Sequence, residues 1–326
     1  MKILVNGGAG YIGSHVVKQL GEEGGHEITV VDNLVTGFED AILYGEFVNL
    51  DLSDFEAVDR LFEEKKFDAV IHFAASLVVP ESVSDPIKYY MNNTVNTTNV
   101  IRCCVKHGVN RFIFSSTAAT YGEPDEKYIP VNENTPTSPI NPYGSSKLMS
   151  ETVLKDTAFA HPDFKYVIFR YFNVAGASLD GKIGQSTKGA THLIKVAAET
   201  ACGKRDKMYV FGDDYNTEDG TCIRDYIHVE DLASAHLEGL RYLNEGNKSD
   251  IFNCGYGHGF SVLEVLDTMR DVSGIDFKAD IKERRAGDPA ILISDNTKIR
   301  EVMNWQPKYD DLKLICKSAL DWEKKI

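Results

Sequence analysis

Short apolar runs alternate with longer helical segments through the first half of this 326-residue chain. Continuous apolar strands joined by helices form a parallel sheet that is covered on both faces. Right-handed crossovers wind such a chain into an open, doubly wound sheet, so the expected fold class is α/β. The predicted strands are 3–5, 28–31, 47–49, 69–73, 112–114 and 167–169, and the predicted helices lie around 12–22, 54–65, 86–107 and 144–160.

This regularity fades in the second half of the chain. Gly- and Asp-rich stretches at 175–189 and 212–220 predict a smaller and less regular C-terminal region. The apolar segment 226–228, followed by the helical pattern 230–243, indicates that the chain returns to the first domain. We therefore expect a first domain of residues 1–175, with returning segments near 224–245, and a smaller α/β domain of residues 176–326.

Charge and cysteine content exclude several classes of partner. The chain has 35 Lys and Arg against 49 Asp and Glu, a formal charge of −14, with no basic tail or stripe. This argues against nucleic acid or an anionic membrane as a partner. Six cysteines show neither a Cys-x-x-Cys pattern nor a Cys/His cluster, so we expect free thiols, a cytoplasmic location and no metal site. No apolar run has transmembrane length.

A glycine-rich turn follows the first predicted strand and opens the first predicted helix. Gly7, Gly10 and Gly13 allow a tight turn and a close approach of the backbone to a pyrophosphate at the positive helix N-terminus. Asp32 ends the second predicted strand, 19 residues after Gly13. A carboxylate there accepts hydrogen bonds from the adenosine ribose hydroxyls and repels a 2′-phosphate, which predicts NAD rather than NADP.

Two further segments have both a cofactor interpretation and a structural one. Asp51-Leu52, after the third predicted strand, could contact the adenine, or Asp51 could cap the helix that follows. Residue type alone favours both equally. Phe73-Ala74-Ala75 offers small residues where a cofactor crosses the sheet edge, although close helix packing explains the same residues.

Tyr143 and Lys147 lie four residues apart at the start of a predicted helix, so both side chains share one helical face. A neighbouring ammonium favours the phenolate form of a tyrosine, so the pair can act as a general base. Tyr309 and Lys313 have the same spacing near the C-terminus. Two features of the chain distinguish the Tyr143–Lys147 pair. They are the glycine-rich nucleotide-binding turn near the N-terminus and the three hydroxyl residues Ser115-Ser116-Thr117.

Together these residues resemble the extended short-chain dehydrogenase/reductase superfamily, and within it the family of UDP-glucose 4-epimerases, over essentially the whole chain. The resemblance implies a Rossmann-type sheet with a UDP-sugar-binding C-terminal domain. The motifs that carry it are Gly7-x-x-Gly10-x-x-Gly13, Asp32-Asn33-Leu34, His72-Phe73-Ala74-Ala75, Phe114-Ser115-Ser116-Thr117, Asn141-Pro142-Tyr143-Gly144-x-x-Lys147, Arg170-Tyr171-Phe172-Asn173, Thr217-Glu218-Asp219-Gly220-Thr221, Arg224-Asp225-Tyr226-Ile227-His228 and Arg284-Arg285-x-Gly287-Asp288.

The resemblance implies an isomerase that interconverts UDP-galactose and UDP-glucose with tightly bound NAD. Tyr143 would take the proton from the sugar 4-hydroxyl while a hydride leaves C4 for the nicotinamide. The 4-keto sugar would then turn and receive the hydride on its other face. Lys147 would bind the nicotinamide ribose and lower the pKa of Tyr143. Thr117 would bond the 4-oxygen and relay its proton; its structural alternative is a strand-end residue bonded to its own backbone.

The resemblance also implies a set of binding residues, each of a type that commonly has a structural role instead. Arg224 and Arg285 would hold the diphosphate with planar guanidinium groups, and the segment 209–211, otherwise an ordinary strand, would lie along the uracil. Asn92 has the alternative of a polar contact between packed helices. Besides the glycines and Asp32, the cofactor residues are Tyr11, Ile12, Asn33, Asp51, Leu52, Phe73, Ala74, Ala75, Asn92, Tyr143, Lys147 and Phe172, and the substrate residues are Thr117, Tyr143, Asn173, His192, Tyr209, Val210, Phe211, Arg224, Arg285, Asp288 and Leu292.

Three positions depart from the family pattern. The segment 76–79 lacks a lysine that many epimerases carry near the cofactor. His192 stands where an asparagine is usual, and it could still donate to a phosphate with some pH dependence. Leu292 falls at the pocket position thought to limit bulk at sugar C2. A leucine there leaves the acceptance of 2-N-acetyl sugars open.

Several related functions remain to be weighed. Dehydratases of the superfamily place Asp-Glu after the threonine, whereas Thr117 is followed by Ala118-Ala119, which have no acid–base chemistry. A reductase would exchange its nicotinamide and often uses NADP. The alternatives are a UDP-N-acetylglucosamine or dual-specificity 4-epimerase, and an idle NAD-binding scaffold or regulator, against which the intact catalytic residues argue. The resemblance further implies a homodimer packed through helices near 86–107 and 141–160.

Overall fold

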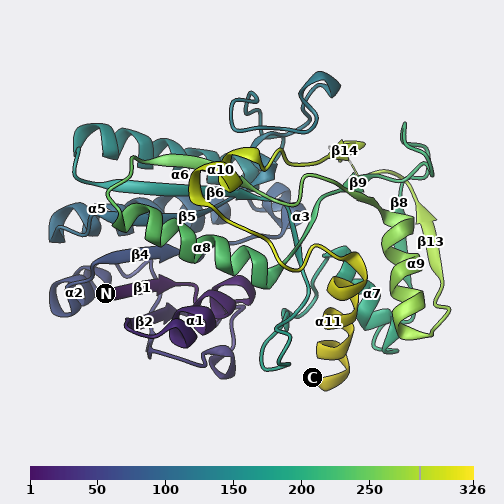
Figure 1. Cartoon of the computed structure of the whole chain (residues 1–326), viewed down its shortest axis with the longest axis horizontal. Helices are drawn as coiled ribbons and strands as arrows, with labels where there is room; N and C mark the ends of the chain where they lie inside the picture. The colour runs from purple at the N-terminus through teal and green to yellow at the C-terminus, as the bar shows by residue number, and fades with distance from the viewer. Residues whose placement is uncertain (286–287) are drawn as a thin grey trace.

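The centre of the computed structural model, which describes residues 1–285 and 288–326, is a seven-stranded sheet. The strand order is β11-β6-β5-β4-β1-β2-β3, and every neighbouring pair is parallel. This confirms the doubly wound, Rossmann-type sheet that the sequence predicts (Figure 1). The strands are β1 (Lys2–Asn6), β2 (Glu27–Asp32), β3 (Glu46–Asn49), β4 (Ala69–His72), β5 (Arg111–Thr117), β6 (Lys165–Tyr171) and β11 (Asp250–Cys254).

Alternate residues of the strands enter two hydrophobic clusters, one on each face of the sheet. On β1, Ile3 and Val5 pack on one face and Leu4 packs on the other. Each such side chain stabilises the fold by about 1.5–3 kcal/mol, and burial on both faces explains why the strands are continuously apolar. One face is covered by α1 (Tyr11–Glu23) and α8 (Val229–Asn244), and the other by α2 (Phe55–Lys65), α5 (Asn96–His107) and α6 (Pro142–Ala160).

The start of α6 is fixed by the residues just before Tyr143. The Asn141 side chain accepts a hydrogen bond from the Gly144 amide at 2.9 Å, and Pro142 occupies the first helical position. Such a cap satisfies an amide that the helix leaves unpaired, and proline is preorganised for the first turn. Tyr143 therefore lies in the first turn of α6, and Lys147 lies one turn further along the same face.

The stretch 86–107 is helical, as predicted, but it contains a wider turn. A π-helix, η2 (Tyr90–Val95), separates α4 (Pro86–Tyr89) from α5. Turns of this kind are short and are frequent at functional sites. Hydrophobic periodicity gives no signal for such a turn, because it shifts the helix by a single residue.

The region after residue 175 forms a smaller layer beside the sheet (Figure 1). Three helices pack on one another, and two small groups of strands lie next to them. The helices are α7 (Leu193–Ala201), α9 (Val262–Ser273) and α11 (Leu312–Lys325); β8 (Met208–Phe211) pairs with β13 (Ala279–Lys282), and β9 (Ile223–Arg224) pairs with β12 (Phe260–Ser261) and β14 (Ile291–Leu292).

The chain returns from this layer to the sheet. β10 (Tyr226–His228) pairs with β7 (Asn173–Ala175), and α8 follows it across the sheet. β11 then joins the sheet beside β6, beyond the returning segments expected near 224–245. We propose the division at residue 175, with β11 assigned to the first domain. The remaining elements are η1 (Glu39–Ala41), α3 (Val79–Ser84), η3 (Ala118–Thr120), η4 (Glu126–Tyr128) and α10 (Thr297–Met303).

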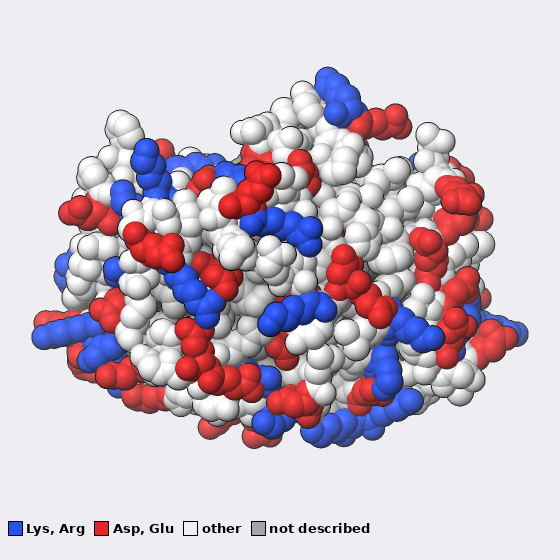
Figure 2. Space-filling view, in the orientation of Figure 1, with Lys and Arg blue, Asp and Glu red and all other residues white. Residues whose placement is uncertain are grey.

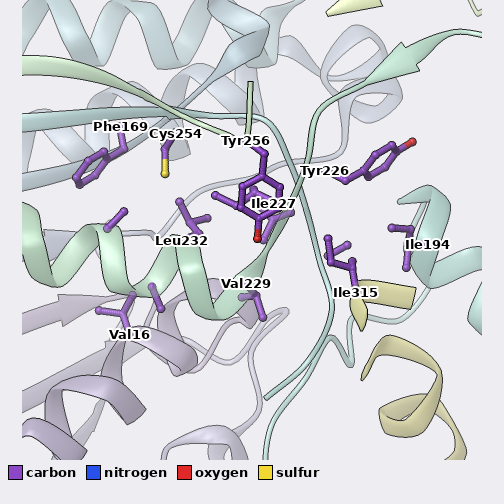
Figure 3. Close-up of a cluster of buried hydrophobic side chains, with 14 of the residues drawn as sticks. Val16, Phe169, Ile194, Tyr226, Ile227, Val229, Leu232, Cys254, Tyr256 and Ile315 are labelled. Atoms are coloured by element: carbon purple, nitrogen blue, oxygen red, sulfur yellow. The ribbon is translucent and has the colours of Figure 1, made fainter. Parts of the chain in front are cut away.

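One hydrophobic core joins the two regions. Figure 3 shows it running from Val16 on α1 and Leu232 on α8, past Ile227 of β10, to Ile194 on α7 and Ile315 on α11. Each of these side chains is at most 2% exposed. Because a close-packed core resists relative motion, the edge where the two regions meet has a defined shape.

Among the described residues, no helix combines the length and the apolar character that a membrane crossing requires. In the same ranges, no group of His, Cys, Asp and Glu is arranged to hold a metal ion. All six cysteines are free thiols, and five of them are buried. On the face shown in Figure 2, Lys and Arg lie scattered among Asp and Glu.

Candidate active site

The glycine-rich turn between β1 and α1 has no room for side chains at two positions. Gly7 has a φ of +76°, and a Cβ there would lie 2.6 Å from the Ala74 amide nitrogen. A Cβ on Gly13 would lie 2.3 Å from the Gly7 carbonyl oxygen. Because α1 begins without a side-chain cap, its first amides remain available to a ligand. A helix N-terminus of this kind is suited to bind a phosphate.

The other residues of the turn support it through the backbone. Gly10 precedes α1, and its amide donates to the Gly7 carbonyl at 3.2 Å. The Tyr11 hydroxyl donates to the Gly176 carbonyl at 2.6 Å, so its side chain reaches the second region. Ile12 packs against the core. At this turn, therefore, Tyr11 and Ile12 offer a ligand their backbone amides.

Asp32 at the end of β2 is buried and already bonded to the backbone. Its carboxylate accepts hydrogen bonds from the amides of Ala9 at 3.1 Å and Leu34 at 2.9 Å. Burial raises the pKa of Asp32, and these bonds oppose the rise. A carboxylate has about four acceptor positions, so Asp32 can brace the glycine turn and still accept from ribose hydroxyls.

Asn33 and Asp51 bond to each other beyond the ends of β2 and β3. The Ser53 amide donates to Asp51 at 2.8 Å, and Asn33 Nδ2 donates to the other carboxylate oxygen at 2.8 Å. Bonds from Ser53, followed by the bond from Asn33, lower the pKa of Asp51. The cap of α2 is Asp54, so the structural alternative for Asp51 is wrong. The Leu52 side chain is buried in the core and can meet a ligand only through its backbone.

The residues after β4 form a wall of the glycine turn. The amides of Phe73 and Ala74 donate to the Asn6 carbonyl at 2.8 Å and 3.1 Å. Ala74 is the residue that a side chain on the first glycine would strike. Ala75 follows as a half-buried methyl group. Close packing of the glycine turn against Ala74 thus requires small side chains. This packing also holds the turn at the edge of the sheet.

Asn92 lies in η2 and joins two packed segments. Its Nδ2 donates to the Ser76 hydroxyl at 2.9 Å, and its Oδ1 accepts from Asn96 at 3.1 Å. These contacts match the structural alternative, and contact with a nicotinamide stays a prediction. The sequence did not point to the adjacent Asn93, which accepts from the Ser76 amide at 2.7 Å and donates to the Ser146 hydroxyl on α6 at 3.0 Å. A run of polar residues inside a helix was the available signal.

Tyr143, Lys147 and Thr117 come together where the end of β5 faces the first turns of α6. Lys147 is 3% exposed, and its ammonium donates to the Ser115 carbonyl at 2.8 Å. Burial raises the pKa of Tyr143, and hydrogen bonding with the Thr117 hydroxyl opposes the rise. Thr117 Oγ1 also accepts from the Ala119 amide at 3.1 Å, so the structural alternative, a bond to the nearby backbone, is present as well.

Burial dominates the electrostatics of the tyrosine–lysine pair. It lowers the pKa of Lys147 to about 7, against the opposing effect of the Glu151 carboxylate. The lysine thus titrates near neutrality, because the low-dielectric surroundings penalise its charged form. The expected lowering of the Tyr143 pKa by Lys147 and by a positively charged nicotinamide stays a prediction.

A small pocket of about 40 Å³ lies between β7 and α7. Asn173 of β7, His192 just before α7, Gln185 and Trp322 line it. Gln185 Nε2 donates to His192 Nδ1 at 2.9 Å, which leaves the other ring nitrogen of His192 for a ligand. Phe172, one residue before Asn173, is buried in a small apolar cluster. Phe172 therefore lies in an apolar cluster, whereas Asn173 faces the pocket.

The strand β8 presents alternate side chains to the surface. Tyr209 is 37% exposed, whereas Val210 is buried in the core, so Val210 can meet a ligand only through its backbone. Phe211 is half-buried, and the Arg285 guanidinium lies 3.9 Å from the centre of its ring. Phe211 and Arg285, two residues expected to contact the substrate, thus contact each other.

Arg224 and Asp288 likewise form an ion pair with each other. Arg224 is nearly buried, and its charge is therefore compensated inside the site. Gly287, which belongs to the same motif, lies outside the described residues. Leu292 in β14 packs against the apolar cluster that contains Phe172, so it lies beside the residues that follow β5.

The site also contains a buried ion pair that the sequence did not point to. Glu151 and Arg170 are 0% and 2% exposed, and their charged atoms lie 2.6 Å apart. Glu151 follows Lys147 by one helical turn, so an acidic residue on the helical face shared by Tyr143 and Lys147 was the available signal.

Comparisons with known proteins cover the whole chain. Residues 3–255 match the model of the NAD dependent epimerase/dehydratase family. The chain is 49% identical to a UDP-glucose 4-epimerase of Azospirillum brasilense over 326 residues, which is 100% of this chain and 92% of that protein. Among solved structures, it is 61% identical to the UDP-Glc/GlcNAc 4-epimerase of Campylobacter jejuni, with a TM-score of 0.87 and coverage of 100% and 99%. A Brucella ovis UDP-glucose 4-epimerase in complex with NAD is 42% identical, with a TM-score of 0.95 and coverage of 99% and 98%.

Proposed function

Because the chain belongs to the NAD dependent epimerase/dehydratase family, we propose that it is a UDP-glucose 4-epimerase, an isomerase that interconverts UDP-galactose and UDP-glucose. The observation that carries the proposal is the convergence of Tyr143, Lys147 and Thr117 at the end of β5, beside a glycine turn suited to a dinucleotide. The similarity to a UDP-glucose 4-epimerase extends over the whole chain, and so over the proposed nucleotide-binding and substrate regions alike.

The cofactor is NAD, and the residues of the turn fit it. Gly7 and Gly13 permit the tight turn because a Cβ at either position would strike the backbone, and such a turn brings backbone amides close to a pyrophosphate. Asp32 retains acceptor capacity for ribose hydroxyls, and its charge repels a 2′-phosphate. Lys147 would hold the nicotinamide ribose. The chemistry that bound NAD supplies is reversible hydride transfer with C4 of the sugar.

Tyr143 would move the proton on the 4-oxygen. As the phenolate it takes the proton of the 4-hydroxyl, and as the phenol it returns the proton when the keto sugar is reduced. Thr117 would bond the same oxygen and keep it in line with Tyr143. Lys147 would favour the phenolate through its positive charge, because unlike charges in a low-dielectric site stabilise each other.

Inversion requires the 4-keto sugar to turn while the nucleotide stays in place. Arg224 and Arg285 would hold the diphosphate, with Asn173 and His192 bonding its oxygens from the pocket side. Tyr209 and Phe211 would flank the uracil with aromatic faces. Both arginines now have protein partners, so substrate phosphates would replace Asp288 on Arg224 and would draw Arg285 from the Phe211 ring.

A dual-specificity enzyme that also accepts 2-N-acetyl sugars is the second candidate. Leu292 lies in the apolar cluster next to Phe172, and leucine is smaller than an aromatic side chain. The UDP-Glc/GlcNAc 4-epimerase of Campylobacter jejuni is 61% identical to this chain. Both observations favour acceptance of a larger group at C2.

The test is an assay of the purified protein with UDP-galactose and, in parallel, UDP-GalNAc, without added cofactor. Separation of the epimers then reports conversion. We expect UDP-galactose to be converted. Conversion of that substrate alone would exclude dual specificity, and conversion of both would establish it. If neither is converted even after NAD is supplied, the proposed substrate class is wrong.

We also propose a homodimer that packs through α3, α4, η2 and α6. Apolar side chains on these elements are exposed, with Val83 at 65%, Ile87 at 68%, Met91 at 53% and Met149 at 48%. These elements pack against one another, and exposed apolar side chains on neighbouring elements are typical of a protein interface. Sedimentation equilibrium measures the mass in solution, and Ile87→Lys should shift it toward the monomer. A wild-type protein that sediments as a monomer at all concentrations would overturn the proposal.

A further inference from the structure

Glu151 is an acidic residue buried behind the catalytic pair. It lies on α6, is 0% exposed, and belongs to none of the residues that would touch a ligand. Its Oε1 accepts from the Ser116 hydroxyl at 2.6 Å and from Arg170 Nε at 2.9 Å, and its Oε2 accepts from Arg170 Nη2 at 2.6 Å. Lys155 lies 3.5 Å from Oε2. Both carboxylate oxygens are thus fully engaged.

These bonds tie α6 to the end of β5. Ser116 stands between Ser115, whose carbonyl accepts from Lys147, and Thr117, whose hydroxyl acts on Tyr143. Three consecutive residues of one strand are therefore each linked to α6, and the link through Ser116 is the one that ends on Glu151. A shift of α6 along the strand would break all three links together.

Arg170 extends the connection to the next strand and beyond. It lies on β6, which pairs with β5, and Ser116 is directly opposite it in the register. Its guanidinium lies 4.9 Å from the centre of the Tyr121 ring, and the Tyr121 hydroxyl donates to Asn253 of β11 at 2.6 Å. The Glu151 carboxylate is thus held by groups that three neighbouring strands position.

Stability alone gives a weak reason for such a pair. Burying two charges costs several kcal/mol per ion, and apolar replacement of a buried ion pair is often neutral or stabilising. Planar guanidinium and carboxylate groups, by contrast, fix both distance and orientation when they bond through two parallel hydrogen bonds. The main effect of this ion pair is therefore to fix the distance and orientation of α6 relative to β6, rather than to stabilise the fold.

We propose that Glu151 is a positioning residue for catalysis: bonded to Arg170 and Ser116, it sets the register of α6 against β5, so that Tyr143 and Lys147 face Thr117. The inference rests on the proposed function, because its effect is measured on epimerisation. It adds to that function a residue that contacts neither substrate nor cofactor.

The charge of Glu151 has a second consequence for the same pair. It raises the pKa of Lys147 against the lowering by burial, and so keeps more of the ammonium charged near neutral pH. Other titratable or charged groups lie around Lys147 and Glu151: Tyr143 and Lys155 on α6, Tyr89 on α4, His72 on β4, Tyr166, Arg170 and Tyr171 on β6, Tyr121 after β5 and His236 on α8. Glu151 is the group that opposes the loss of the lysine proton.

The first test is Glu151→Gln, which keeps the shape of the side chain and removes its charge. We expect kcat to fall by about 10- to 100-fold, since small displacements of catalytic groups have effects of that order. KM for UDP-galactose and the NAD content should stay within about twofold. The alkaline limb of kcat should move to lower pH, because Lys147 loses its proton more readily.

The matched control is Glu323→Gln. Glu323 is also an acidic residue in a buried ion pair, with Lys195, but it joins α11 to α7. The control should lower the thermal midpoint as much as Glu151→Gln does and leave kcat and its pH profile unchanged. If both variants lose stability alike and both keep wild-type kcat and pH profile, Glu151 is only structural and the proposal is overturned.

Ser116→Ala keeps the proposal testable if Glu151→Gln does not fold. The substitution removes one hydrogen bond and leaves both Glu151 oxygens bonded to Arg170, so the fold should persist. We expect kcat to fall about threefold to tenfold, with NAD content unchanged. A folded Ser116→Ala variant with wild-type kcat would overturn the proposal. An inactive wild-type protein would instead overturn the proposed function, so the two failures are distinguishable.

Discussion

The catalytic end of β5 and the substrate end of β8 are built in opposite ways. At β5, Lys147, Glu151 and Arg170 are each at most 3% exposed and bond to the backbone or to one another. At β8, the partly exposed Phe211 has its ring covered by Arg285, which lies at the surface. The proposed catalytic residues are therefore positioned by the sheet and α6, whereas Phe211 and Arg285, two of the proposed substrate residues, lie partly or fully at the surface.

This difference follows from the two tasks. Proton transfer requires fixed distances of about 2.6–3.2 Å between the reacting heavy atoms, so its residues belong on rigid elements. Binding a flexible diphosphate requires positive charge and planar donors, which arginines provide. Substitutions at the catalytic end should consequently change kcat, and substitutions at the substrate end should change KM.

The largest expected effect comes from Tyr143→Phe. The substitution removes only the hydroxyl, so the edge-on ring contact with Tyr89, at 6.4 Å between centroids, should persist. We expect kcat to fall by about 10³-fold or more, while the bound NAD and the thermal midpoint stay unchanged. Turnover and NAD released on denaturation are the two measurements. Wild-type activity in the variant would remove Tyr143 from the chemistry, and no activity in either protein would favour the idle scaffold.

Gly13→Ala tests whether the rigidity of the sheet extends to the cofactor turn. Its Cβ would overlap the Gly7 carbonyl oxygen, which belongs to the backbone and has little freedom to move. We expect NAD to be lost on purification and the free energy of unfolding to fall by about 1–3 kcal/mol. Gly24→Ala is the control, because no atom lies within 4 Å of its Cβ, although its φ of +74° carries strain. Retention of NAD by Gly13→Ala would contradict the tight turn.

The free energy of unfolding should fall at acid pH because the first domain contains buried histidines. Burial lowers the pKa of His72 and of His15 to about 3. A histidine whose folded pKa lies below its unfolded value of about 6.5 contributes stability that is complete above that value. The contribution is lost as the pH falls from about 6.5 toward 3, at up to about 1.4 kcal/mol per pH unit for each histidine.

His72→Gln checks this dependence by removing one of the titrating groups. His72 bonds the Asn6 side chain at 3.2 Å and the Thr97 hydroxyl at 2.9 Å, and glutamine can replace part of that bonding. Denaturant unfolding at pH 7, 6 and 5 should show a smaller loss of stability with falling pH than in the wild type. Parallel curves for the two proteins would show that the pKa of His72 is the same in the folded and unfolded states.

The same contrast separates what the sequence predicts from what it does not. The strands, the glycine turn and the Tyr143–Lys147 spacing follow from local patterns, because periodicity and residue type determine them. No local pattern indicates that β11 joins the sheet after a long intervening segment, or that η2 widens a helix by one residue. Glu151 was overlooked for a related reason: its partner Arg170 is distant in the chain, and only the pairing of β5 with β6 brings them together.

Arg285→Ala tests the substrate end and has the smallest expected effect. Since Arg285 lies at the surface and stacks on Phe211, its loss should leave the thermal midpoint unchanged. We expect KM for UDP-galactose to rise about tenfold, or about 1.4 kcal/mol, with kcat changed by less than about threefold. Arg284→Ala is the matched control, because Arg284 stacks on Tyr215 and pairs with Asp214 at 2.6 Å, and it should leave both constants unchanged. If Arg285→Ala instead lowers kcat at constant KM, recognition and chemistry are not divided between the two ends of the molecule as their burial indicates.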